Sequence, residues 1–276
     1  MNDVQLPADD ETRNVPMGAQ VVSVLNLDGL RKSDFVIDEV PVALVYNGIS
    51  HTVMMVTPQH LEDFALGFSL AEGIVQDVSD VYDIEVHPGC GRGYEVHLTV
   101  SSESFWKLKE HRRTMAGRTG CGICGTESLE GVMRPLKALP FTQRFDLKHY
   151  GAGLTGIAQT EELRSLTGGT HAAVWLRHDG TVVFGREDVG RHVALDKLLG
   201  CRARTKEFDG ALFVSSRASY EMVQKAAACG VEILFAVSAP TALAVEVARR
   251  CNLTLVAFCR EKRANIYTHS QRLIGL

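Results

Sequence analysis

The sequence lacks the features that would place a protein in a membrane or on a nucleic acid. Its most apolar later stretch, residues 233–248, contains Pro240 and Glu246, so we expect no membrane association. Residues 1–17 carry acids and prolines without an apolar core, which argues against a secretory signal peptide. A formal net charge of -4 at pH 7 argues against general binding to nucleic acids or membrane surfaces.

The sequence also lacks a disulfide framework. It has seven cysteines, an odd number, and they are scattered along the chain. This usage fits a reducing compartment, so we expect a cytoplasmic protein. With 276 residues, 45% of them hydrophobic, the chain is long enough for one large domain or two modest ones.

Two of the cysteines, Cys121 and Cys124, form the most informative motif. They lie in the run Thr-Gly-Cys-Gly-Ile-Cys-Gly, residues 119–125, whose glycines leave room for another molecule to approach closely. Two thiols at this spacing can share a metal, form a disulfide or relay sulfur. Structural zinc takes four ligands, and a thioredoxin-like motif opens a helix after a strand. Neither context is plain here, so the alternatives stay open, although we expect no structural metal.

The pattern of the chain predicts a tail followed by two domains. Residues 1–18 read as a flexible tail. Residues 19–150 read as a smaller N-terminal α+β domain that ends in the loop carrying the cysteine pair. Residues 151–276 read as an α/β domain, because strands and helices alternate from about residue 150 onward.

Within the N-terminal domain, Asn47-Gly48 predicts a hairpin between strands 42–46 and 49–56, because both turn positions tolerate a positive φ. Thr57 is expected to cap the following helix, with Pro58 at its first position.

That helix is expected to stop at Gly73. Two more strands, residues 84–86 and 94–100, flank a glycine-rich turn that contains Cys90. Residues 102–118 are rich in Lys and Arg, which is most often a solvated helical face but could also lower thiol pKa values.

The C-terminal domain is predicted to hold a largely parallel sheet with helices on its faces. The predicted strands are residues 172–176, 181–184, 211–214, 233–237 and 254–258. The predicted helices run from about 191 to Gly200, through Met222 to Gly230, and from about 241 to 250. Ligands of such sheets lie outside the carboxyl ends of the strands.

Polar segments occur where that rule places a site. They are Ser215–Ser219, Ser238–Thr241, Arg260–Asn265 and Gly185–His192, and Thr167–His171 adds two glycines beside them. One such segment alone would be a solvated turn, but four that converge would form a phosphate-binding crevice. Asp188 could pair there with an amino group of guanine.

Some of the remaining polar residues have structural interpretations that compete with functional ones. Cys201, Cys229 and Cys251 lie at helix ends or beside strands and fit packing thiols, as Cys90 and Cys259 do, although Cys259 adjoins the basic segment. His171 and His192 fit hydrogen-bonded structural groups as well as ligand-binding ones.

The chain resembles the formate dehydrogenase accessory sulfurtransferase family, FdhD, from about residue 35 onward. The motifs that carry the resemblance are Thr57-Pro58, Gly67-Phe68, Glu72-Gly73, Cys-Gly-Ile-Cys-Gly at 121–125, Thr167–Ala172, Glu187–His192, Asp196-Lys197, Ser216–Glu221, Ser238–Pro240 and Arg260–Tyr267. Two positions depart from the family pattern. Val193 stands where an asparagine is expected, and Glu261-Lys262 where glycines are common.

The resemblance implies a sulfur carrier that takes persulfide sulfur from a cysteine desulfurase. The sulfur goes to the molybdenum bis(molybdopterin guanine dinucleotide) cofactor, which is bound as substrate before its insertion into formate dehydrogenase. The resemblance also implies a cytidine-deaminase-like mixed sheet in the C-terminal domain and a homodimer.

Carried onto this sequence, the resemblance makes Cys121 the persulfide carrier and Cys124 its partner. The cofactor-binding set is Arg260, Glu261, Lys262, Arg263, Ala264, Asn265, Arg217, Ser219, Gly169, His171, Asp188 and His192.

Two other functions compete with a sulfurtransferase. A zinc-dependent deaminase uses H-x-E with P-C-x-x-C, whereas here Gly120 precedes Cys121 and no glutamate follows His171 at that spacing. A non-catalytic chaperone that escorts the molybdenum cofactor would use the cysteines for structure only. A protein-bound persulfide would separate both from a sulfur carrier.

Overall fold

The computed structural model describes residues 15–116, 135–261 and 263–276. Cys121, Cys124 and Lys262 lie outside the described residues, as do residues 1–14 of the expected tail. Within the described ranges, no helix has the length and apolar character needed to cross a membrane.

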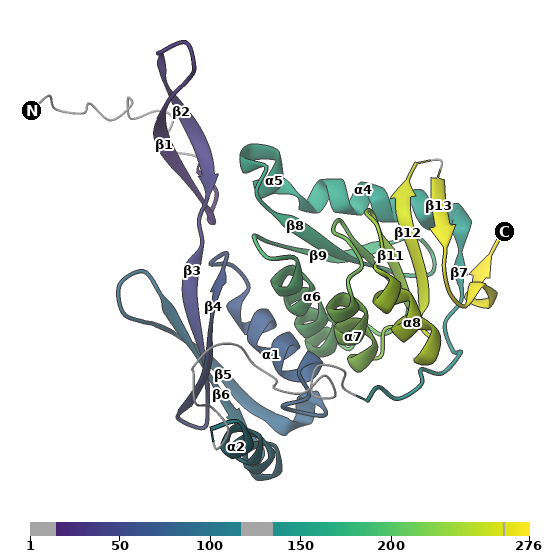
Figure 1. Cartoon of the computed structure of the whole chain (residues 1–276). Coiled ribbons are helices and arrows are strands. Elements are labelled where there is room, and N and C mark those ends of the chain that lie inside the picture. The colour runs from purple at the N-terminus through teal and green to yellow at the C-terminus, as the bar shows by residue number, and fades with distance from the viewer. Residues whose placement is uncertain (1–14, 117–134, 262) are drawn as a thin grey trace, which may run out of the picture.

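The N-terminal part contains two small sheets. Strands β1 (Ala19–Leu25) and β2 (Arg31–Ile37) pair antiparallel and form a hairpin that projects from the molecule (Figure 1). A four-stranded sheet follows, in the order β4-β3-β6-β5. Its strands are β3 (Val40–Tyr46), β4 (Ile49–Val56), β5 (Val81–Pro88) and β6 (Tyr94–Val100). The predicted turn is confirmed, because Asn47 and Gly48 both have positive φ.

Helix α1 (Leu61–Ala71) covers one face of this sheet, and its Phe64 and Ala65 pack into the same core as Val42 and Leu44 of β3. The short 3-10 helix η1 (Val78–Asp80) precedes β5, and α2 (Ser102–Ala116) follows β6.

The predicted cap of α1 is wrong, because the helix begins at Leu61 with His60 as its N-cap. Thr57 instead lies buried between the two parts of the molecule, where its hydroxyl accepts a hydrogen bond from Val189 N at 3.1 Å.

The C-terminal part is built on a six-stranded sheet in the order β13-β12-β11-β10-β8-β9. Its strands are β8 (His171–Leu176), β9 (Val182–Asp188), β10 (Ala211–Val214), β11 (Ile233–Ala236), β12 (Thr254–Arg260) and β13 (Arg263–Ile266). Strands β10, β11 and β12 are parallel, whereas β8, β9 and β13 join antiparallel. The sheet is therefore mixed rather than largely parallel, because two of its strand connections are hairpins.

Helices cover both faces of this sheet (Figure 1). One face packs against α6 (Arg191–Thr205), α7 (Tyr220–Ala228) and α8 (Ala242–Arg250). The other face packs against α4 (Tyr150–Thr160), and the short helix α5 (Glu162–Thr167) leads into β8. Alternate residues of β10 divide between the two cores: Leu212 belongs to the first, and Phe213 to the second.

A short parallel pair, β7 (Phe145–Asp146) and β14 (Leu273–Ile274), ties the last described residues to the segment before α4. The 3-10 helices η2 (Leu147–His149) and η3 (Ser270–Arg272) flank this pair. The buried guanidinium of Arg272 donates from Nε to Glu232 at 2.8 Å and from Nη2 to the carbonyl of Pro140 at 2.5 Å. It thereby fixes the chain that enters the C-terminal part.

Helices α1 and α6 join the two parts across a very close contact. A Cβ atom added to Gly67 would lie 1.8 Å from the carbonyl oxygen of Asp196, and one added to Gly200 would lie 1.9 Å from that of Asp63. The prediction that α6 ends at Gly200 is therefore wrong. The glycine lies inside the helix, where it allows α1 to approach.

Candidate functional site

The carboxyl ends of β10, β11 and β12 share one edge of the sheet, as the sequence predicts. We call this edge the rim and define it by Ser215–Ser219, Ser238–Thr241 and the β12–β13 turn. Backbone hydrogen bonds join the segments: Thr241 N donates to Ala218 O at 3.1 Å, and Phe258 N donates to Ser238 O at 3.2 Å.

The start of β8 and the end of β9 also reach the rim. His171 pairs with Asp188 across the two strands, and next to it Ala172 N donates to the hydroxyl of Ser215 at 2.9 Å. Residues 185–188 therefore belong to β9, not to a loop as predicted, because the hairpin partner β8 extends the ladder. Gly169 is exposed in the segment before β8. A Cβ atom added to it would lie 3.3 Å from the side chain of Ile37 in β2.

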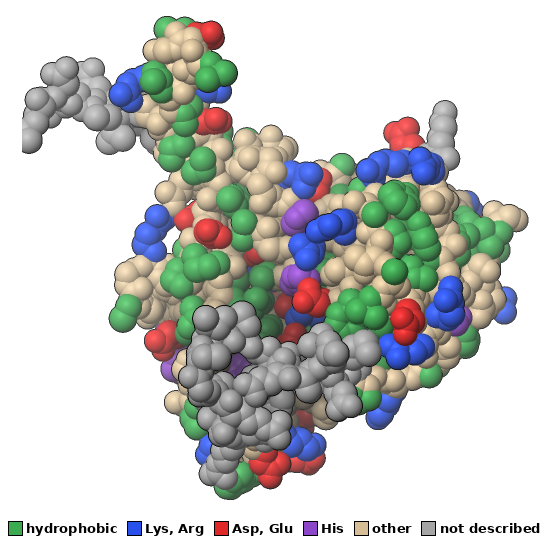
Figure 2. Space-filling view, viewed as in Figure 1, with side chains coloured by type: hydrophobic (Ala, Val, Ile, Leu, Met, Phe, Trp, Pro, Cys, Tyr) green, Lys and Arg blue, Asp and Glu red, His purple; other side chains and the backbone are tan. Residues whose placement is uncertain are grey.

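Buried polar atoms without partners gather at this end of the rim. Among the described residues, His171 Nδ1, Arg191 Nε and Ser219 Oγ have no hydrogen-bond partner. Ser219 precedes α7, yet its hydroxyl makes no capping bond. An unsatisfied buried polar atom costs about 1–3 kcal/mol, so a ligand that supplied partners would be stabilised here. Figure 2 shows histidine and cationic side chains meeting near the centre of the viewed face.

The two histidines predicted as site residues have lowered pKa values. Burial is the main cause for His171, and the nearby Arg164 and Arg191 lower its pKa further. Burial also lowers the pKa of His192, against the opposing effect of Glu221, whose carboxylate lies 2.7 Å from His192 Nε2. The local charge is therefore set by arginine rather than by protonated imidazole.

Asp188 does not face the rim as a free carboxylate. Its side chain has no exposed surface, and its oxygens accept hydrogen bonds from Thr57 N at 2.9 Å and Gly190 N at 2.8 Å. The ammonium of Lys197, also wholly buried, lies 2.7 Å away. The expectation that Asp188 binds the amino group of guanine is therefore wrong, because partners inside the protein already occupy its carboxylate oxygens.

The basic segment at the other end of the rim forms a hairpin rather than a loop. Arg260 is the last residue of β12, and its guanidinium donates to Val237 O at 2.6 Å and to Cys259 O at 2.9 Å. Glu261 lies in the turn, and Arg263, Ala264 and Asn265 are exposed residues of β13.

Two groups of predicted residues thus lie at opposite ends of the rim. His171, His192 and Ser219 gather near the starts of β8, α6 and α7, with the exposed Arg217 in the β10–α7 connection. The β12–β13 hairpin lies three strand spacings from β8, or about 15 Å. A ligand that met both groups would have to be extended.

Arg191 lies inside the predicted Gly185–His192 segment but is absent from the predicted set of site residues, in which Asp188 and His192 represent this segment. The available signal was an arginine at the start of a helix that directly follows a strand ending at the rim.

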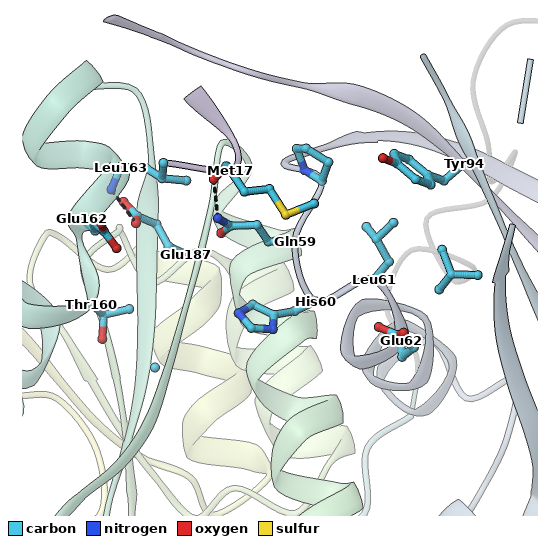
Figure 3. Close-up of a pocket in the computed structure, with 13 residues that line it drawn as sticks. Met17, Gln59, His60, Leu61, Glu62, Tyr94, Thr160, Glu162, Leu163 and Glu187 are labelled. Atoms are coloured by element: carbon cyan, nitrogen blue, oxygen red, sulfur yellow. Dashed lines mark hydrogen bonds between the residues drawn. The ribbon is translucent and has the colours of Figure 1, made fainter. Parts of the chain in front are cut away.

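A cavity of about 580 Å³ lies away from the rim, between the start of α1 and the β9–α5 region (Figure 3). His60 points into it, and Glu62 and Glu162 line it together with Tyr94 and Leu163. Gly185 and Glu187 of the predicted Gly185–His192 segment line this cavity, but no residue of the predicted cofactor-binding set does. Its three glutamates, Glu62, Glu162 and Glu187, make it a poor receptor for phosphates.

A second cavity, of about 510 Å³, is lined by residues 135–140, the end of α1 and the end of α7. Residues 135–140 are the described stretch that follows the segment carrying the cysteine pair. Since Ser219 at the start of α7 lies at the rim and Ala228 at its end lines this cavity, residues 135–140 enter at the opposite edge of the sheet.

Most of the described cysteines fit the predicted packing roles, but Cys90 does not, because it is exposed. Cys201, Cys251 and Cys259 are buried, and burial raises the pKa of each thiol, that of Cys259 to about 11. Cys90 is exposed in the β5–β6 turn. Within the ranges that the structure covers, no group of three or more His, Cys, Asp or Glu side chains could hold a metal ion.

Comparison with known proteins adds the family. The structure matches a crystal structure from Desulfotalea psychrophila described as a formate dehydrogenase accessory protein. The TM-score is 0.71 at 22% sequence identity, covering 93% of this chain and 98% of the other, and this likeness shows a shared fold. The model of the FdhD/NarQ family matches residues 37–274, most of the chain. On this match, the chain belongs to the FdhD/NarQ family.

Proposed function

We propose that this protein is a sulfur carrier in the maturation of formate dehydrogenase. It would take sulfur from a cysteine desulfurase and pass it to the molybdenum bis(molybdopterin guanine dinucleotide) cofactor, its substrate, before formate dehydrogenase receives that cofactor. The observation that carries the proposal is the family match over residues 37–274, a range that contains Cys121 and Cys124. The description of the similar crystal structure supports the coarser role, in the maturation of formate dehydrogenase. We further propose a cytoplasmic homodimer.

The loading step needs only thiol chemistry. The thiolate of Cys121 attacks the outer sulfur of the donor's persulfide, and a bond forms between that sulfur and Cys121 Sγ. The sulfur–sulfur bond of the donor breaks, and the desulfurase cysteine leaves as a thiolate. This exchange consumes no oxidant or reductant. Cys124 is the partner thiol in this proposal.

The rim supports binding of the cofactor's nucleotide tails. Its unpartnered donors lie at one end, and Arg260 and Arg263 lie at the other, so an extended polyanion would meet cations at both. We propose that contacts come from His171, His192, Ser219, Arg217, Gly169 and residues 260–265. Asp188, which the structure buries, is not in this set.

The competing functions lack comparable support. A deaminase needs a metal with three protein ligands and a general acid/base, and Ala173 stands where that glutamate would follow His171. A chaperone without sulfur chemistry would bind the cofactor but would never carry a persulfide.

The first experiment loads the protein with a cysteine desulfurase and cysteine and maps persulfide by mass spectrometry. We expect about one added sulfur per chain, on Cys121, and none on that peptide in Cys121→Ala. Cys90→Ala is the matched control, since Cys90 is exposed but lies outside the motif. Loading that is unchanged in Cys121→Ala, or absent from the unaltered protein, contradicts the carrier role.

The second experiment tests the rim with GDP, a mimic of one cofactor arm, by titration calorimetry. Charge-assisted hydrogen bonds contribute roughly 1.5–3 kcal/mol, so Arg260→Ala should raise Kd about tenfold or more. Arg249→Ala, an exposed arginine in the last turn of α8, should leave Kd unchanged. Equal affinity in Arg260→Ala and the unaltered protein would remove the β12–β13 hairpin from the site.

A further inference from the structure

We propose that Arg191 is an anion-binding residue of the rim and that the buried pair of Lys197 and Asp188 positions it. The inference rests on the proposed function in one respect, since it takes the anion to be a phosphate of a nucleotide tail. Arg191, which is outside the set predicted from the sequence, would contact the phosphate. The buried Lys197–Asp188 pair would touch no ligand but would hold Arg191 in position.

Arg191 differs from the other buried or half-buried arginines. Arg186 pairs with Asp63 at 2.6 Å, Arg272 pairs with Glu232 at 2.8 Å, and Arg202 donates to Cys229 O at 2.7 Å. Among the described residues, Arg191 has no ion-pair partner, and its buried Nε has no hydrogen-bond partner. A half-buried guanidinium without an internal partner can donate hydrogen bonds to an acceptor from outside the chain.

The surroundings of Arg191 favour an anion. His171, whose Nδ1 also lacks a partner, is close enough to Arg191 and Arg164 for both to lower its pKa, after the larger effect of burial. The neighbouring carboxylate of Glu221 is 2.7 Å from His192, and that of Glu161 is 3.7 Å from Arg164. A phosphate oxygen would therefore meet donors from two elements, β8 and α6, and among the described residues around it Arg191 is a cation that no carboxylate pairs.

The segment just before Arg191 is fixed by hydrogen bonds at three consecutive residues. Asp188 accepts from Gly190 N at 2.8 Å and from Thr57 N at 2.9 Å. The hydroxyl of Thr57 accepts a hydrogen bond from Val189 N at 3.1 Å. The N-terminal part of the molecule is therefore hydrogen-bonded to the turn that precedes α6.

Lys197 completes this arrangement six residues along α6. Its ammonium lies 2.7 Å from the Asp188 carboxylate and donates to Thr57 O at 2.9 Å. Neither charged side chain has any exposed surface, so neither can contact a ligand. A buried pair is costly and persists only where its geometry is well satisfied. Here it fixes the backbone from which the Arg191 side chain projects.

The test is a double-mutant cycle on anion affinity, with inorganic pyrophosphate as the first probe and GDP as the second. We expect Arg191→Ala to raise the Kd of pyrophosphate about tenfold, and Lys197→Met to raise it about fivefold. If Lys197 acts through Arg191, the double variant should bind no more weakly than Arg191→Ala alone. A merely structural lysine would give independent losses that multiply to about fiftyfold.

Two further variants keep the test decisive. Lys225 is the matched control, a buried lysine 2.9 Å from Asp196 and 2.8 Å from Glu72, so Lys225→Met should lower stability without changing the Kd of pyrophosphate. If Lys197→Met does not fold, Thr57→Val takes its place. It removes the acceptor for Val189 N, and its expected loss of about threefold should also vanish beside Arg191→Ala.

Each outcome decides one claim. Unchanged pyrophosphate affinity in Arg191→Ala, or no pyrophosphate binding by the unaltered protein, overturns the assignment of Arg191. Losses that multiply in the double variant overturn the positioning role. Pyrophosphate binding that depends on Arg191, without any GDP binding, supports the anion site and contradicts the guanine-nucleotide part of the proposed function instead.

Discussion

Gly67 of α1 and Gly200 of α6 face each other so closely that neither helix leaves room for a side chain. The position for a Gly67 Cβ lies 2.7 Å from Gly200 N, and the position for a Gly200 Cβ lies 2.8 Å from Gly67 N. These contacts involve backbone atoms, which cannot rotate away as a flexible side chain can. The two parts of the molecule therefore meet as one packed body.

The first prediction concerns this contact. Gly67→Ala should lower the free energy of unfolding by roughly 1–3 kcal/mol or more, because α1 must move away from α6 to admit the methyl group. Denaturant unfolding measures the change. Gly151→Ala in α4 is the control, since nothing lies within 4 Å of its Cβ position. A Gly67→Ala variant as stable as Gly151→Ala would show that the contact is looser than described.

The second prediction concerns the pH dependence of stability. Asp196 has no exposed surface, and burial raises its pKa to about 6 in spite of the nearby Lys225. Because the folded pKa exceeds the usual value, the contribution of Asp196 to stability is present at low pH and is lost as the pH rises through 6. Asp196→Asn stays uncharged, so it should reduce the fall in unfolding free energy between about pH 4 and about pH 6.5.

Asp146 gives a control of opposite sign for that measurement. A hydrogen bond from Lys148 lowers its pKa, so its contribution to stability grows as the pH rises from acid. Asp146→Asn should therefore leave the fall in unfolding free energy intact or make it steeper. An Asp196→Asn variant with the slope of the unaltered protein would show that Asp196 is ionised throughout this range.

The third prediction compares the residues that cap α7 and α8. Thr241 accepts a hydrogen bond from Ala244 N at 3.2 Å, so Thr241→Ala should cost about 1 kcal/mol of stability. The buried hydroxyl of Ser219 makes no such bond, so Ser219→Ala should cost little stability and weaken GDP binding instead. Thermal unfolding and calorimetry separate the two effects. The ligand role of Ser219 fails if its alanine variant loses stability but keeps its GDP affinity.

The sequence predicted what short-range patterns determine. Asn47-Gly48 specified a hairpin, because the two residues tolerate the positive φ that the turn requires. The alternation of strands and helices predicted the rim, since consecutive parallel strands end at the same edge of a sheet.

The wrong predictions share one cause, which is contact between residues far apart in the sequence. Thr57 is a residue type that often caps helices, and glycine often ends them. In this structure Thr57 instead accepts a hydrogen bond from Val189 N, and Gly200 lies where α1 and α6 touch. From the sequence alone, Asp188 could be a free carboxylate at the rim. In the structure it pairs with Lys197 and accepts a hydrogen bond from Thr57 N. No local pattern shows which distant element will supply a partner.

Arg272 also bears on how the chain folds as it is synthesised. Its bonds to Glu232 and Pro140, and the neighbouring β7–β14 pairing, join residues that leave the ribosome late to segments made much earlier. Domains generally fold as units, with the N-terminal one first. The four-stranded sheet can assemble during translation, whereas Glu232, next to β11, has only hydrogen bonds from Thr142 and Gln143 and no cation beside it until residue 272 emerges. The C-terminal part should therefore reach its full stability only after Arg272 and β14 have been made, because Glu232 and β7 gain these partners then.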